Sequence, residues 1–107
     1  MECPYCGTSL EEHEATECFD AWVVERVLGW ERYISPTFEG RYAYLVGCYL
    51  YTVSESALVG RFSPSTDLVA AHPVWEKLTG QAKDELIASD LVYDPLAVCK
   101  KALEETA

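Results

Sequence analysis

The first thirty residues, MECPYCGTSLEEHEATECFDAWVVERVLGW (1–30), place four potential metal ligands directly ahead of an amphipathic segment. Cys3 and Cys6 are separated by two residues, so both thiolates can bind one tetrahedral ion, and Gly7 allows the tight turn that directs backbone amides toward the sulfurs. His13 and Cys18 supply two more ligands in the pattern C-x2-C-x6-H-x4-C. Because this set fills a tetrahedral shell and leaves no position for substrate, it predicts a structural zinc knuckle.

Two other interpretations of these residues are open. His13 lies among glutamates, so its imidazole could be solvated, and a water or a carboxylate could take its place as the fourth ligand. The Cys-x-x-Cys pair could instead be redox-active. Redox-active pairs sit at a strand-to-helix turn within a βαβ unit, however, whereas this pair lies at the N-terminus of the sequence. The prediction is a structural Zn²⁺ held by four ligands: Cys3, Cys6, His13 and Cys18.

Composition limits the class of protein. The chain has 107 residues, enough for one domain, and half of them are apolar, with three Trp and seven Tyr, which argues against a disordered chain. Its formal charge of −10 disfavours direct binding to nucleic acid. No apolar run reaches the roughly 18 residues of a membrane span, and a signal-peptide pattern is lacking. We therefore expect a cytoplasmic protein with reduced thiols, in which Cys48 and Cys99 are small buried residues.

A helix is predicted over residues 16–29. Thr16 is a good N-cap, Glu17 and Asp20 are placed at the positive end of the helix dipole, and Gly29 suits the C-terminal turn. Residues at three- and four-residue steps form one apolar stripe: Phe19, Trp22, Val23, Val27 and Trp30. The tryptophans could stack on a ligand, but core packing is the more frequent role.

The β-forming residues that follow predict antiparallel strands near 31–35, 41–53 and 57–62. The middle strand is long, and Gly47 indicates a bulge or bend in it. Simple alternation would place Tyr44 and Leu50 on one face, and Leu45 and Tyr51 on the other. Both faces are then largely apolar, so helices or a partner chain should cover them; an exposed tyrosine face would instead be a binding platform.

Helical patterns return after residue 63. Capping residues precede a segment of helical spacing that Pro73 interrupts, which predicts a kink, or a turn followed by a helix that stops at Gly80. A short helix is expected over 82–89, and Asp94 begins a last helix that ends near Glu105. His72 is expected to be a packed or surface residue rather than a catalytic one. The predicted fold is α+β, with about three helices packed on a small antiparallel sheet and an N-terminal zinc knuckle.

Three of these segments, in this order, carry a resemblance to a known family. ATECFDAWVVERVLGW (15–30) resembles the opening helix of the phage α-β-α sandwich domain family, 65–78 resembles its second helix, and PLAVCKKAL (95–103) its final helix. The resemblance implies a phage-type α-β-α sandwich domain over 16–107, to which the zinc-binding segment predicted from the ligand spacing, 1–18, is added as a continuous N-terminal part. Proteins of this family have no general assigned activity, so the resemblance implies no catalytic residues. Here the β-rich material lies between the first two helices, whereas the family places its strands mainly after the second.

The expected function is protein binding rather than catalysis, because the ligand set is closed and neither a glycine-rich phosphate loop nor a Ser-His-Asp arrangement stands out. A small acidic phage-type accessory protein could present carboxylates to the basic nucleic-acid-binding surface of a host protein. It would thereby inhibit host defence, as anti-CRISPR or anti-restriction proteins do. The acidic faces could also serve solubility alone.

Two further functions are alternatives. A homodimer or larger homo-oligomer could hold a small host signalling ligand between its subunits, provided that arginines converge on it: Arg26, Arg32, Arg41 or Arg61. The chain could also be a phage protein with a purely structural or regulatory role.

Overall fold

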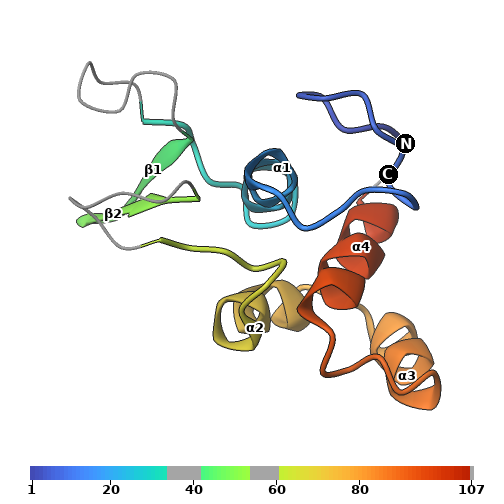
Figure 1. Cartoon of the computed structure of the whole chain (residues 1–107). Coiled ribbons are helices and arrows are strands. Elements are labelled where there is room, and N and C mark those ends of the chain that lie inside the picture. Colours follow the sequence, from blue (N-terminus) through green and yellow to red (C-terminus); the bar gives the residue numbers. More distant parts are fainter. Residues whose placement is uncertain (34–41, 54–60, 107) are drawn as a thin grey trace.

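The computed structural model describes residues 1–33, 42–53 and 61–106, and within these ranges it has four helices and a two-stranded antiparallel sheet (Figure 1). The fold class is α+β, as predicted. The elements follow one another in this order: α1 (Glu17–Arg26), β1 (Ala43–Val46), β2 (Tyr49–Thr52), α2 (Leu68–Glu76), α3 (Gly80–Ala88) and α4 (Pro95–Glu105). None of the helices in the described ranges combines the length and the apolar content needed to cross a membrane.

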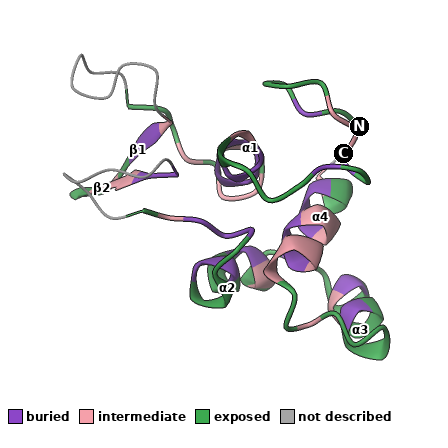
Figure 2. Cartoon of the chain, viewed as in Figure 1, coloured by how far each residue is buried: buried purple, intermediate pink, exposed green. Residues whose placement is uncertain are grey.

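Helix α1 lies between two hydrophobic cores (Figures 1 and 2). Phe19 and Val23 belong to the larger core, which α2, α3 and α4 complete, whereas Ala21 and Val24 pack with Tyr44 of the hairpin in the smaller one. Six consecutive residues of α1, 19–24, are buried. The prediction of a single apolar stripe is therefore wrong, because consecutive buried residues cover more than one side of a helix.

The predicted strand over 41–53 is in fact a hairpin. Leu45 pairs with Leu50 and Tyr44 with Tyr51, and the two-residue loop begins with Gly47 at φ 62°, a positive φ at the first loop position as in a type II′ turn. Directly paired residues share a face, so Tyr44 lies on the face of Tyr51 and not on that of Leu50. The predicted alternation is thus reversed after the turn. Cys48, expected to be buried, is exposed in this loop.

The strands predicted on either side of this hairpin are reduced to isolated bridges in the part of the chain that the structure describes. Arg32 forms an antiparallel bridge with Tyr44 of β1, whereas Arg61 forms a parallel bridge with Thr52 of β2, so the antiparallel pairing predicted for the last segment is wrong at this bridge. The remainder of the predicted segments, 34–35 and 57–60, lies outside the described residues.

The C-terminal helices begin at their capping residues. The Asp67 carboxylate accepts from the Val69 amide at 3.0 Å, and the Asp94 carboxylate accepts from the amide of Leu96 at 3.1 Å. Helix α2 runs on through Pro73, which is exposed, so a separate helix beginning at this proline is wrong. Gly80 does not end a helix: it is the first residue of α3, because the Thr79 hydroxyl caps that helix.

A buried carboxylate ties α1 to the segment before α2. Asp20 accepts hydrogen bonds from the Ser63 hydroxyl and the Ser65 amide, both at 2.9 Å. Burial raises the pKa of Asp20, although the serine contacts and Arg61 act in the opposite direction. Close by, the Cys99 thiol donates to the Pro64 carbonyl at 3.3 Å, and burial strongly raises the pKa of this thiol. Cys99 is a core residue, as predicted.

Candidate metal centre

The four residues predicted to bind metal come together in space. One ligand atom from each of Cys3, Cys6, His13 and Cys18 lies within 4.8 Å of all the others. The Nε2 atom of His13 is 3.3 Å from the Cys6 sulfur and 3.7 Å from the Cys18 sulfur. Such a group can hold one metal ion.

Backbone hydrogen bonds shape the turn that carries the first two thiols. The Cys3 amide donates to the Thr8 carbonyl, and the Gly7 amide donates to the Cys3 carbonyl, both at 2.9 Å. Gly7 has φ 76°, a conformation that a side chain would strain. The tight turn expected from the glycine is therefore present, and it brings Cys3 and Cys6 to the same side of the loop.

The two thiols of this turn differ in their acidity. The Thr8 hydroxyl, 3.3 Å from the Cys6 sulfur, and the Thr8 amide lower the pKa of Cys6 to about 6. Burial raises the pKa of Cys3, although backbone hydrogen bonds from Tyr5 and Cys6 lower it in part. Because metals bind the thiolate, Cys6 is ready to bind at neutral pH, whereas Cys3 must give up a proton when an ion arrives.

The imidazole of His13 points toward the thiols rather than into solvent. Its exposed fraction is only 4%, and its ring centroid lies 4.9 Å from that of Phe19. Nδ1 is 2.8 Å from the Glu14 carbonyl, which fixes the proton on Nδ1 and leaves the Nε2 lone pair for a metal. The alternative in which His13 is solvated is therefore wrong.

Cys18 connects the site to the helical core because it lies in the first turn of α1. Thr16 is the N-cap residue, as predicted, but its side chain makes no capping hydrogen bond, and its hydroxyl lies 3.2 Å from the Cys18 sulfur instead. On the other side, the Lys100 ammonium of α4 donates to the Glu11 carbonyl at 3.0 Å. The ligand loop is thus attached to two helices.

Sequence reasoning missed Glu25, which joins the knuckle to the hairpin. Its carboxylate accepts from the hydroxyl of Tyr5, next to the ligands, and from that of Tyr44 in β1, the latter at 2.8 Å. Burial, followed by the contact with Glu25, raises the pKa of both tyrosines. The sequence does indicate that Glu25 lies near the metal ligands, because it follows Cys18 by seven residues and therefore lies on the same side of α1 as that ligand.

The other histidine is not part of this group. His72 is an exposed residue of α2 with Nδ1 3.2 Å from the Glu76 carboxylate, the surface position being one of the two that were predicted for it.

Comparisons with known proteins do not assign a family to this arrangement. No family model matches the chain, and no curated protein or solved structure matches it either. The resemblance to the phage α-β-α sandwich domain family stays a prediction, and the function must be argued from the chemistry of the site.

Proposed function

We propose that this chain is a small, acidic, phage-type accessory protein that binds a host protein, with a structural Zn²⁺ held by Cys3, Cys6, His13 and Cys18. The four-ligand group carries the proposal. Zinc bonds of about 2.3 Å to sulfur and 2.0–2.1 Å to nitrogen give a tetrahedral sulfur–nitrogen separation of about 3.5 Å. The two separations from His13 Nε2, 3.3 and 3.7 Å, lie on either side of that value.

The donor set favours zinc and a structural role. Three thiolates and one imidazole suit a tetrahedral ion that prefers sulfur and nitrogen donors. All four positions come from the chain itself, so no position is left for a water or substrate, which a catalytic zinc requires. The proposal is therefore a protein that acts by binding and not as an enzyme.

The zinc assignment is tested by elemental analysis and by thermal unfolding with and without a chelator. We expect one zinc per chain in the wild type and in Cys48→Ser, whose thiol is exposed on the hairpin, and loss of zinc in Cys18→Ser. At free zinc 100-fold above Kd, binding adds about 2.7 kcal/mol, and each kcal/mol shifts Tm by about 4–8 °C in a domain of this size. A chelator should thus lower Tm by about 11–22 °C. A Tm that is indifferent to the chelator overturns the assignment.

The metal-binding loop also carries a concentration of negative charge. Four glutamates there are exposed: Glu11, Glu12 and Glu14 in the loop, and Glu17 at the first position of α1. A metal that fixes the loop holds these carboxylates in one arrangement, which lowers the entropy lost on binding. The partner we propose is a host protein with a basic nucleic-acid-binding surface in the bacterial cytoplasm, and the proposed outcome is inhibition of a defence system of the CRISPR or restriction type.

This binding is tested by capture of partners from host lysate, identification by mass spectrometry, and titration of the purified partner. We expect the affinity to fall at least tenfold when salt rises from 50 to 500 mM. The triple variant Glu11→Gln, Glu12→Gln, Glu14→Gln should show a similar loss. A control with the same net charge neutralises three other exposed carboxylates: Glu31, Asp84 and Glu104. Equal affinities for the two triple variants would show that the carboxylates of the loop have no special role, and binding that is insensitive to salt would show that the charge serves solubility alone.

The described arginines do not favour the alternative of a small anionic ligand. Arg26 donates to the Thr106 carbonyl at 2.7 Å, the Arg32 guanidinium lies 4.6 Å from the Tyr42 ring centre, and Arg61 donates to the Val53 carbonyl. Arg32 and Arg61 also pair with opposite edges of the hairpin. Arg41 lies outside the described residues.

A further inference from the structure

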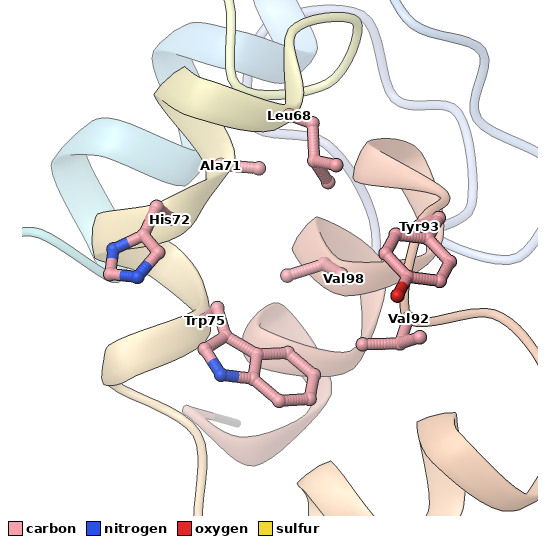
Figure 3. Close-up of a pocket in the computed structure, with 7 residues that line it drawn as sticks. All are labelled: Leu68, Ala71, His72, Trp75, Val92, Tyr93 and Val98. Carbon is pink, nitrogen blue, oxygen red and sulfur yellow. The ribbon is translucent and has the colours of Figure 1, made fainter.

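A second feature, remote in sequence from the metal ligands, is an apolar cavity of about 180 Å³ between α2, α4 and the segment before α4 (Figure 3). Seven residues line it, all apolar or aromatic except His72: Leu68, Ala71, His72 and Trp75 of α2, Val98 of α4, and Val92 and Tyr93. Val98 and Ala71 are buried, whereas Tyr93 is 78% exposed and Leu68 is 43% exposed. Large apolar side chains thus remain in water around an opening that leads to the core.

The size of the cavity indicates what it can hold. Pockets for drug-sized ligands have volumes of about 300–1,000 Å³, well above this one. One bulky side chain from another protein is a better match. Figure 3 shows the rings of Trp75 and Tyr93 on opposite sides of the opening, and an aromatic-lined pocket that receives one apolar anchor is the usual centre of a protein–protein contact.

Charged residues beside the lining indicate the rest of the occupant. Four exposed carboxylates lie next to lining residues in sequence or within two positions of them: Asp67 and Asp94, the N-caps of α2 and α4, Glu76, which pairs with His72, and Asp90. The ammonium groups nearby are Lys77 and Lys83, the latter 5.8 Å from the centre of the Trp75 ring. Carboxylates therefore outnumber ammonium groups around the pocket, and this favours basic residues in the partner.

We propose that this pocket docks a protein segment that presents one bulky apolar side chain flanked by lysine or arginine. The inference rests on the proposed function, protein binding, and names the surface and the chemistry of one contact. The apolar side chain enters between Trp75 and Tyr93, and its basic neighbours meet the carboxylates at the ends of α2 and α4.

The test uses three synthetic helical peptides and ¹⁵N-labelled protein. The first has a central phenylalanine with lysines one turn to each side, the second has serine in place of phenylalanine, and the third has glutamates in place of the lysines. We expect the first to shift the amide signals of Leu68 and Tyr93 and the indole signal of Trp75. The other two should bind at least tenfold more weakly. Equal binding of the charge-reversed peptide, or shifts confined to other surfaces, overturns the proposal.

Matched variants of the protein locate the contact. Tyr93→Ser should lower the affinity for the first peptide at least tenfold. Tyr49→Ser, which removes an equally large exposed tyrosine from the hairpin, should leave that affinity unchanged. Leu68→Ser and Ile87→Ser form a second pair of the same kind, the latter on α3. Signals of the pocket that shift with protein concentration alone would identify a second copy as the occupant and would also overturn the proposal.

The outcomes with an authentic host partner separate this inference from the proposed function. A complex that forms in wild type and keeps its affinity in both Tyr93→Ser and Leu68→Ser refutes the pocket assignment and leaves the host-binding function standing. Binding of the lysine–phenylalanine peptide at the pocket, together with the absence of any host protein in the capture experiment, supports the pocket and refutes the host function.

Discussion

Replacement of Asp20 by alanine tests the contact that joins α1 to the segment before α2. The change removes the acceptor of two hydrogen bonds, from the Ser63 hydroxyl and the Ser65 amide. The Ser63 hydroxyl keeps a second contact, with the Thr66 hydroxyl at 2.7 Å, so the main loss is the acceptor for the buried Ser65 amide. A buried donor left without a partner costs about 1–3 kcal/mol, and the space vacated by the carboxylate adds to this. Removal of a buried charge offsets part of the loss.

We expect Asp20→Ala to lower the free energy of unfolding by about 2–3 kcal/mol, and Tm by about 8–24 °C. Asp20→Asn keeps an oxygen for the Ser65 amide and carries no charge, so it should stay within about 1 kcal/mol of the wild type. The exposed Asp84 of α3 provides a control, and Asp84→Ala should change stability by less than about 0.5 kcal/mol.

The assay is urea unfolding followed by tryptophan fluorescence, in buffer that contains zinc, with m-values compared among the variants. Two results would contradict this role of Asp20: an alanine variant as stable as the wild type, or an asparagine variant that loses as much stability as the alanine variant. The second result would mean that the charge, and not the pair of hydrogen bonds, sustains this contact.

Other expectations concern cysteines, glycines and a cap. In metal-free folded protein, alkylation of Cys6 should reach half its maximal rate near pH 6, because its pKa is lowered to about 6 and the thiolate forms above that pH. The buried Cys99 should be alkylated only on unfolding, and peptide mass spectrometry would distinguish the two sites. Gly47→Ala should cost about 1–2 kcal/mol because of φ 62°, whereas Gly80→Ala, in open space at ordinary φ, should add about 0.4–1 kcal/mol in urea titrations. Asp94→Ala should lower the free energy of unfolding by about 0.5–2 kcal/mol, measured by calorimetry, and an unchanged Tm would contradict the role of Asp94 as a helix cap.

Chemistry that depends on local spacing was predictable from the sequence. The ligand spacing identified the four residues that meet around one point, and capping chemistry placed the starts of α2 and α4 at Leu68 and Pro95. In each case the interacting groups lie within a short stretch of chain, so a pattern in that stretch contains the necessary information.

Features that depend on distant segments were not predictable. Asp20 meets serines more than forty residues away, and Glu25 meets a tyrosine on each side of it in sequence. Local composition does not say which segment will supply a partner. The hairpin was missed for a different reason: in the sequence Gly47 indicates a bulge or bend within one strand, whereas at positive φ it begins a turn that reverses which face every later side chain occupies.

The burial of α1 on both sides means that the molecule can open in stages. The hairpin contacts the rest of the described chain mainly through the small core around Val24 and Tyr44, while α2, α3 and α4 share a separate core on the other side of α1. The hairpin can therefore detach without disrupting the helices. In native-state hydrogen exchange, amides of β1 and β2 should exchange through such a partial opening, and those in the middle of α1 only when the whole protein unfolds.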